Sequence, residues 1–288
     1  MDVPSVFAHI AELVTEKRSP LVLGLDPRSE RMPHGYVGNE GVVRFHSRLI
    51  ELVADHVVAV KPQIAFFEQL GEDGLWVYAE TCRLARQAGL VVIGDIKRGD
   101  IGSTAEAYAE AHFRWADVVT VNPYLGDDSL EPFFARCRDD TKEGGKGVFV
   151  LCATSNPGWR RFQTVEDRDG RPLYLSVAAA IAEWNDELRG GDVWGPVGAV
   201  VGATHPEVLA SVRRATRHSW LLVPGVGAQG ARMQDLKHAF DADGHGALVP
   251  VSRGLASCFE PSDVGWEKRV RDAAEMLVAE ARSVVLDG

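Results

Sequence analysis

The chain has 288 residues, of which 45% are hydrophobic and 8% aromatic, and its formal net charge at pH 7 is −10. These values are typical of a globular protein with a large core, and the acidic balance argues against non-specific binding of nucleic acid, which needs a basic face. No run approaches the roughly 18 apolar residues of a transmembrane helix, and the N-terminus lacks the pattern of a signal peptide, so we expect no contact with a membrane.

The cysteines and histidines form no pattern of a metal or disulfide site. Cys82, Cys137, Cys152 and Cys258 are widely spaced without a C-x-x-C motif, which fits reduced thiols in the cytoplasm better than disulfides or zinc ligands. The nine histidines show neither an H-x-x-x-H nor an H-E-x-x-H spacing. We therefore expect a protein without a metal ion or another cofactor.

Eight short aliphatic runs recur along the chain and predict strands. They are Leu21–Leu25, Val57–Val60, Val91–Ile93, Val118–Val121, Val148–Leu151, Val197–Val201, Leu221–Val223 and Ala247–Val251. Strands that alternate with helices indicate a parallel sheet, and eight such units are the number that closes a TIM barrel. We therefore predict an α/β fold in which residues 1–288 form a single (β/α)8 barrel domain.

Apolar residues at helical spacing lie between these runs. Helices are predicted at Pro4–Lys17, ahead of the first strand, and at Val42–Asp55, Gly74–Ala88, Ser103–Trp115, Leu173–Leu188, Pro206–Arg217, Arg232–Ala239 and Asp263–Leu286. Three long connections, Pro27–Gly41, Asn122–Gly147 and Ala153–Pro172, follow strands and are expected over the catalytic face. An open doubly wound sheet is the alternative, but it would scatter the polar strand ends that a barrel gathers in one ring.

The most unusual stretch is D-I-K-R-G-D-I-G-S-T, residues 95–104, at the end of the third predicted strand. Asp95 and Lys97 are two residues apart and point to the same side of an extended strand, and Asp100 follows Gly99, where the chain can turn. A salt bridge at a strand end explains a lone D-x-K pair. The complete pattern is much rarer, and it predicts a charged catalytic centre.

Other strand ends also carry polar residues. Asp26 closes L-G-L-D-P-R and Lys61 closes V-A-V-K-P, on the two strands that precede the one with Asp95 and Lys97. In a barrel these ends are adjacent, so we expect an alternating network of carboxylates and ammonium groups in which the acids keep the lysines protonated. Further polar residues after the fourth and fifth strands are Asn122 and Ser155.

The loops after the last two predicted strands indicate an anion site. The sequence P-G-V-G-A-Q-G, residues 224–230, contains G-x-G-x-x-G, but it follows the seventh strand and no acidic residue stands ~20 positions further on, so we reject a dinucleotide site. We expect the glycines instead to expose backbone N–H groups to a phosphate. Arg253, after the eighth strand, adds a guanidinium where barrels usually hold phosphates.

These motifs together resemble the orotidine 5′-phosphate decarboxylase family over nearly the whole chain. The likeness rests on DIKRGDIGST (95–104), KPQIAFFE (61–68), TSNPG (154–158) and PGVGAQG (224–230), and the second motif with the long loops is similar to the larger bacterial subgroup. The resemblance implies a carboxy-lyase that converts orotidine 5′-phosphate to UMP and CO2 in de novo pyrimidine biosynthesis.

The resemblance also implies roles for individual residues. Lys97 is implied as the proton donor, with Asp95 beside the carboxylate of the substrate. Asp26 and Lys61 are implied to hold ribose hydroxyls, and Lys61 belongs to the catalytic network as well. Ser155 is implied to bind the pyrimidine.

The remaining implied roles concern the phosphate and a second subunit. Gln229 and Arg253 are implied to bind the phosphate. Asp100, a member of the catalytic set, is implied to reach the active site of a neighbouring subunit together with Ile101 and Thr104. The resemblance therefore implies a homodimer with shared active sites.

Two alternatives remain open. A related barrel enzyme decarboxylates a keto-sugar phosphate with the same D-x-K pattern, but it needs Mg²⁺ and further acidic ligands. Lys61 stands where one of those acids is expected, which disfavours this reading. The second alternative is a non-catalytic phosphate-binding barrel whose charges stabilise a dimer.

Overall fold

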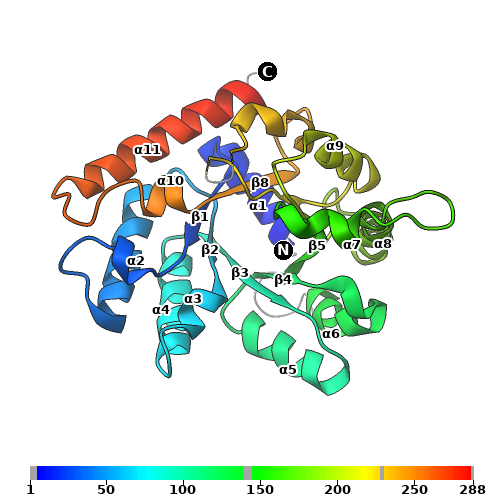
Figure 1. Ribbon diagram of the computed structural model, residues 1–288, viewed down its shortest axis with the longest axis horizontal. Coiled ribbons are helices and arrows are strands. Elements are labelled where there is room, and N and C mark those ends of the chain that lie inside the picture. Colours follow the sequence, from blue (N-terminus) through cyan, green and yellow to red (C-terminus); the bar gives the residue numbers. More distant parts are fainter. Residues whose placement is uncertain (1–4, 139–144, 228–229, 287–288) are drawn as a thin grey trace.

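A closed barrel of parallel strands forms the centre of the molecule (Figure 1). The computed structural model describes residues 5–138, 145–227 and 230–286. Within these ranges the strands are β1 (Leu21–Leu25), β2 (Ala59–Pro62), β3 (Val91–Arg98), β4 (Val118–Val121), β5 (Gly147–Ala153), β6 (Val197–Val201), β7 (Leu221–Leu222) and β8 (Ala247–Val251). Each strand pairs with the next, and β8 pairs with β1. The predicted (β/α)8 barrel is confirmed.

Helices surround the barrel (Figure 1). The longer ones are α1 (Val6–Lys17), α2 (Gly38–Val53), α4 (Gly74–Gln87), α5 (Gly102–Phe113), α6 (Asp127–Arg138), α8 (Leu173–Leu188), α9 (Pro206–Ala215) and α11 (Trp266–Ala281). Short helices are α3 (Ile64–Glu68), α7 (Arg160–Gln163) and α10 (Arg253–Ala256). Single turns or brief 3-10 helices are η1 (Ser29–Arg31), η2 (Pro123–Leu125), η3 (Pro157–Trp159) and η4 (Met233–Ala239), and η5 (Arg282–Leu286) is a π-helix.

The segment 122–147 was predicted to be a long loop, and this prediction differs most from the structure. It contains η2 and α6, and α6 packs against α5 and β5. Its buried side chains, such as Leu130, Phe133, Phe134 and Cys137, have helical spacing. Pro132 lies inside the helix and masked this signal, because a proline in a helix interior removes an N–H donor and usually ends the helix.

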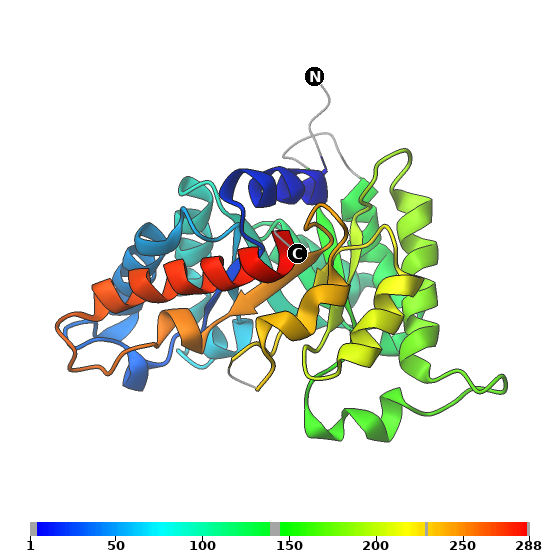
Figure 2. The same cartoon turned by 90° about the horizontal axis from the view of Figure 1, so that it is seen from above.

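Helix α1 lies across the amino-terminal end of the barrel (Figure 2). It begins where the Ser5 hydroxyl accepts a hydrogen bond from the Ala8 amide at 3.3 Å, a common N-cap. Phe7 and Ile10 are fully buried, and the ring of Phe7 packs edge-on against Phe149 of β5, with 5.2 Å between centroids. This end of the barrel is therefore filled by apolar side chains.

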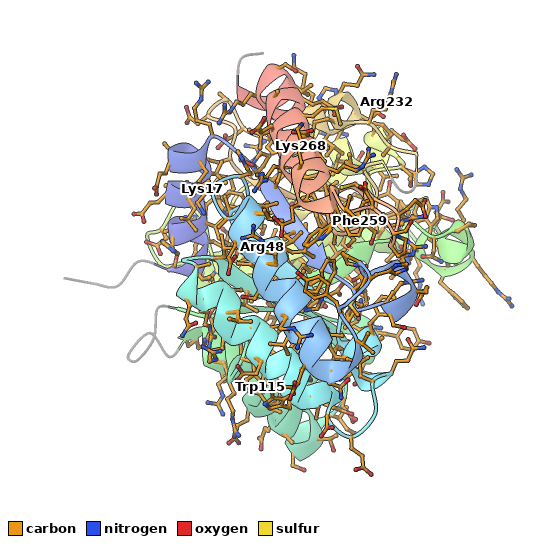
Figure 3. All side chains as sticks on the ribbon, turned by 90° about the vertical axis from the view of Figure 1, so that its left-hand side faces the viewer. Lys17, Arg48, Trp115, Arg232, Phe259 and Lys268 are labelled. Carbon is orange, nitrogen blue, oxygen red and sulfur yellow. The ribbon has the colours of Figure 1, made fainter. Side chains whose placement is uncertain are left out.

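The first and last long helices of the ring, α2 and α11, lie side by side (Figure 3). Arg48 on α2 donates from Nε and Nη2 to the two carboxylate oxygens of Glu267 on α11, at 2.8 and 2.7 Å. The geometry is bidentate, but both side chains are 37% exposed, so the pair contributes at most about 1 kcal/mol. Buried apolar contacts, such as that of Phe45 with Trp266, hold the two helices together.

Candidate active site

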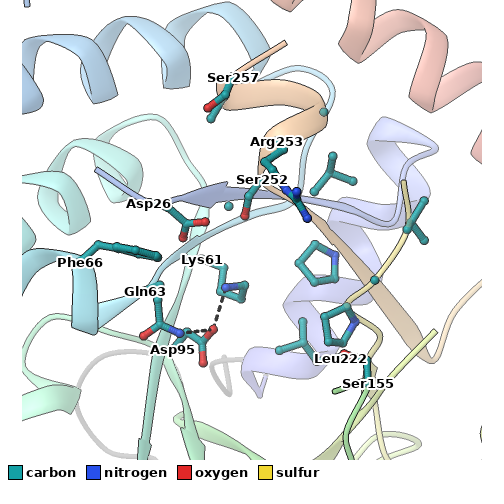
Figure 4. A pocket seen from close by; sticks show the side chains of 18 of the residues that line it. Asp26, Lys61, Gln63, Phe66, Asp95, Ser155, Leu222, Ser252, Arg253 and Ser257 are labelled. Carbon is teal, nitrogen blue, oxygen red and sulfur yellow. Dashed lines mark hydrogen bonds and ion pairs between the residues drawn. The ribbon is translucent and has the colours of Figure 1, made fainter. Parts of the chain in front are cut away.

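A cavity of about 570 Å³ opens at the carboxyl ends of the strands. Its walls come from strands and loops on all sides of the barrel, which is why residues far apart in the sequence meet there (Figure 4). The polar lining includes Asp26, Arg28, Arg31, Lys61, Gln63, Asp95, Lys97, Thr120, Ser155, Ser252 and Arg253. The cavity thus contains the predicted site residues Asp26 (directly after β1), Lys61 of β2, Asp95 and Lys97 of β3, Ser155 and Arg253.

Asp95 of β3 is the centre of this cavity's charged network. Its side chain is 9% exposed, and it forms ion pairs with two lysines from different directions. Lys61 of β2 donates from Nζ to Oδ2 at 2.7 Å, as drawn in Figure 4. Lys97 donates from Nζ to the other oxygen, Oδ1. One carboxylate therefore holds two ammonium groups in place.

Two neutral donors complete the shell around Asp95. Gln63 donates from Nε2 to Oδ2 at 3.0 Å, and Thr120 of β4 donates its hydroxyl to Oδ1 at 3.1 Å. Neither residue is among the site residues predicted from the sequence. The available signals were that Gln63 stands two residues after Lys61, on the same side of an extended chain, and that Thr120 is the polar residue in the otherwise aliphatic strand V-V-T-V.

Burial and charge shift the pKa values of this network in opposite directions. Burial alone would raise the pKa of Asp95, but the nearby ammonium groups of Lys61 and Lys97 outweigh it and hold that pKa well below its usual range. Burial would likewise lower the pKa of Lys61, but the carboxylates of Asp95 and Asp26 raise it above its ordinary value. Buried ion pairs add little to stability compared with apolar packing, so this network is better explained by function than by folding.

The predicted alternation of acids and lysines needs one correction. The ion pairs join both lysines to Asp95, whereas Asp26 acts on Lys61 through space, by its charge. Asp26 lines the same cavity and lies on the side of Lys61 away from Asp95 (Figure 4). Its carboxylate therefore lines the cavity beside Lys61 without joining the ion pairs of Asp95.

Lys97 differs from Lys61 in its exposure and in its backbone. Its side chain is 44% exposed, against 10% for Lys61, so it is the lysine with more freedom to reach a ligand. Its φ of 47° lies in the left-handed region, and the pairing of β3 with β4 shifts register between Gly94 and Arg98. The regular strand expected from the sequence is therefore bulged at Lys97, and the bulge determines how its side chain returns to Asp95.

The opposite wall of the cavity comes from the loops after β7 and β8. It is lined by Gly225 and Val226 after β7, and by Ser252 and Arg253, where β8 leads into α10. At Gly24 of β1, a Cβ atom would lie 1.9 Å from Ser252 Oγ, so only glycine lets these segments approach so closely. The wall combines a guanidinium with a glycine-containing loop, which suits a phosphate.

The other predicted phosphate residue, Gln229, lies outside the described residues. Asn122, which the sequence placed among the polar strand ends, is instead a structural cap. Its side chain accepts a hydrogen bond from the Tyr124 amide at 3.0 Å at the start of η2.

Asp100, Ile101 and Thr104 lie at the start of α5, outside the lining of the cavity. The Asp100 carboxylate accepts a hydrogen bond from the Ile101 amide at 2.8 Å. Ile101 is 58% exposed, and Thr104 is exposed as well. These three residues therefore do not join Asp95 and Lys97 within one subunit.

Within residues 5–138, 145–227 and 230–286, no group of three or more His, Cys, Asp or Glu side chains is arranged to hold a metal ion. No helix in the same part of the chain is long and apolar enough to cross a membrane.

Known proteins resemble this chain along most of its length. A family model described as orotidine 5′-phosphate decarboxylase / HUMPS family matches residues 19–262. The orotidine 5′-phosphate decarboxylase of Rhodopirellula baltica is 43% identical over 277 residues, covering 87% of this chain and 90% of that protein. The same-named protein of a Roseiflexus species is 46% identical over 241 residues, covering 82% and 83%. The structure of Leishmania donovani OMP decarboxylase matches with a TM-score of 0.80 and 38% identity, covering 97% of this chain and 98% of that one. The chain therefore belongs to the orotidine 5′-phosphate decarboxylase / HUMPS family.

Proposed function

We propose that the chain decarboxylates orotidine 5′-phosphate to UMP and CO2 in pyrimidine biosynthesis, with Lys97 as the proton donor. The observation that carries this proposal is the buried Asp95 held between two lysines, opposite a wall that suits a phosphate. Relatives with this activity in their names match most of the chain. The widely spaced cysteines, without a C-x-x-C motif, support a cytoplasmic location.

The reaction calls for a fixed positive charge. The bond between C6 of the pyrimidine and the carboxylate carbon breaks, CO2 leaves, and the electron pair remains on C6. No carbonyl group is adjacent to C6 to accept that pair, so a preorganised cation beside it gives the largest stabilisation. The ammonium of Lys97 supplies this charge and then transfers a proton to C6, which yields UMP.

The residues around Lys97 hold it for this step. Asp95 fixes the ammonium by an ion pair, and Lys61 balances the remaining charge of Asp95. We favour stabilisation by Lys97 over repulsion between Asp95 and the substrate carboxylate, because two lysines already compensate the charge of Asp95. We propose that Asp26 and Lys61, which line the cavity, hold ribose hydroxyls, and that Ser155 binds the pyrimidine.

The phosphate is proposed to bind at the wall formed by Arg253 and the loop after β7, with Gln229 as a further ligand. The phosphate is remote from C6 and takes no part in the bond changes there. The free energy of its binding lowers the reaction barrier by holding the pyrimidine against Lys97.

The turnover test separates this proposal from the two alternatives. Conversion of orotidine 5′-phosphate to UMP lowers the ultraviolet absorbance, and we expect a kcat of at least about 1 s⁻¹ that EDTA does not change. Keto-sugar phosphates are expected to remain unchanged. Turnover of a keto-sugar phosphate that EDTA abolishes would instead support the Mg²⁺-dependent reaction. A folded protein that binds UMP but turns over neither substrate would support a phosphate-binding barrel.

We also propose that two copies of the chain form a homodimer with shared active sites. Asp100, Ile101 and Thr104 lie outside the cavity of their own subunit, at an exposed helix start. Nearby on the same face of the barrel, after β4, Tyr124 is 85% and Leu125 47% exposed. These exposed apolar side chains suit an interface that would bring Asp100 to the cavity of the partner.

Mixing two inactive variants tests the shared site. Lys97→Ala and Asp100→Ala are each expected to be inactive alone. After the subunits of an equal mixture exchange, half of the dimers contain one of each, and one of their two sites has both residues. We therefore expect about one quarter of the wild-type activity to return.

The control for this mixture is Lys97→Ala combined with a Lys97→Ala, Asp100→Ala double variant, which should stay inactive. If the equal mixture stays inactive while mass analysis shows mixed dimers, Asp100 acts within its own subunit. A protein that sediments as a monomer at working concentration contradicts the dimer.

A further inference from the structure

We propose that Thr120 is a positioning residue that sets the place of the Lys97 ammonium. The inference deepens the proposed function, on which it rests. Thr120 is 1% exposed and lies on β4, beside the bulged end of β3. It contributes no charge, and it is not among the site residues predicted from the sequence.

The hydroxyl of Thr120 uses its full hydrogen-bonding capacity at this point. Its oxygen accepts from the backbone amides of Ile96 and Lys97, each at 2.9 Å. The hydroxyl itself donates a hydrogen bond to Asp95 Oδ1 at 3.1 Å. A hydroxyl has one donor and two acceptor positions, so the two amides occupy both acceptor positions and direct the proton to the carboxylate.

The bulge explains why these amides need such a partner. On β3 the paired residues step from Gly94 to Arg98, while on β4 the opposing residues step only from Val119 to Val121. The residues between them on β3 therefore cannot all find regular backbone partners on β4, and the amides of Ile96 and Lys97 bond a side chain there. Thr120, the residue that faces the bulge, replaces those partners with its side chain.

The same hydroxyl thereby holds Lys97 at both ends. At the backbone, it bonds the amide of a residue whose φ of 47° is unfavourable for any side chain with a Cβ atom. At the far end, it orients the Asp95 oxygen that receives the Lys97 ammonium. A carboxylate alone would fix only the far end, and the stem of the lysine would stay free to swing.

Thr120→Val tests the inference, because it keeps the shape of the side chain and removes only the hydroxyl. We expect kcat to fall about 10- to 100-fold, since a displacement near 1 Å in a reacting group costs this much, while KM changes less than about threefold. Thr120→Ser restores the hydroxyl and is expected to keep kcat within about threefold of wild type. The affinity for UMP, measured by calorimetry, should stay within about threefold in both variants.

Thr216→Val is the matched control. Thr216 is also fully buried, and its hydroxyl donates to the Val212 carbonyl at 2.8 Å, away from the cavity. Loss of either hydroxyl should lower the melting temperature by a few degrees, about 3–8 °C. Only Thr120→Val should lower kcat per folded site. Equal kcat values in the two valine variants would overturn the inference, as would a Ser variant as impaired as the Val variant.

Amide hydrogen exchange provides a readout that does not depend on turnover. In the wild-type protein the amides of Ile96 and Lys97 should exchange slowly, and in Thr120→Val they should exchange at least about tenfold faster than in wild type, with Val119 unchanged. Fast exchange of both amides in the wild type would overturn the inference whether or not the protein is a decarboxylase. Absence of wild-type turnover would overturn the proposed function, and the catalytic part of this inference with it.

Discussion

Lys97→Ala is expected to lower kcat by at least about 10⁴-fold, because it removes both the fixed charge beside C6 and the proton that C6 takes up. The fold should persist. Asp95 would still hold Lys61, Gln63 and Thr120, so the variant leaves no unpaired buried charge. Absorbance assays over long incubations would measure the residual rate, and thermal unfolding would verify the fold.

Lys268→Ala is the matched control for this lysine. Lys268 lies on α11, is 75% exposed and pairs with Asp272 one helical turn away. Its removal should leave kcat unchanged. A Lys97→Ala variant with more than about one tenth of the wild-type kcat contradicts the assigned proton donor, because no other ammonium is expected to replace it at C6.

Asp95→Asn is expected to have the largest effect on stability. The amide keeps the shape of the carboxylate but removes the charge that compensates the buried Lys61, and its N–H groups face ammonium donors. Breaking a buried pair from one side costs about 3–5 kcal/mol of unfolding free energy. We expect a loss of this size at pH 7 in urea titrations, together with a fall in kcat of at least about 10³-fold.

The loss of unfolding free energy in Asp95→Asn should depend on pH, which tests the role of the Asp95 charge independently. The pKa of Asp95 is lower in the folded protein than the ordinary value of 3.8, so its contribution to stability is present above pH 3.8 and is lost as the pH falls from there through the lower folded value. The difference in unfolding free energy between wild type and Asp95→Asn should therefore become smaller in acid. Lys61 behaves in the opposite sense, since its pKa lies above 10.5 and its contribution is lost only as the pH rises through that folded value.

Asp272→Asn is the control for Asp95→Asn, because it removes an exposed ion pair and should change the unfolding free energy by less than about 1 kcal/mol. If Asp95→Asn is as stable as wild type at pH 7, Lys61 has another counter-charge, and the central place of Asp95 in the network is wrong.

The strands were predictable where both faces of the strand are buried. Runs such as Leu21–Leu25 and Val197–Val201 match the observed strands residue for residue, because a strand buried on both sides is aliphatic throughout. The predicted third strand stopped too early, at Ile93, because the charged Asp95 and Lys97 resemble a strand end. The barrel interior accepts these charges by pairing them, which no local pattern reveals.

Some features predicted from the sequence involve a second subunit or residues outside those that the structure describes. The homodimer, the assignment of Asp100, Ile101 and Thr104 to a partner's site, and the treatment of residues 1–288 as one domain stay predictions. The role of Gln229 also stays a prediction, because it lies outside the described residues.

The amino-acid sequence by itself determined the alternation that closes the barrel and the identity of the charged residues at its carboxyl end. Both follow from local properties, namely aliphatic runs of strand length and charges that interrupt them. Only the tertiary structure decided which Asp95 oxygen receives Lys61 and which receives Lys97, and it added Gln63 and Thr120 to the site. These contacts depend on the register of neighbouring strands and on a bulge at a left-handed lysine, and both are set by the packing of the whole barrel.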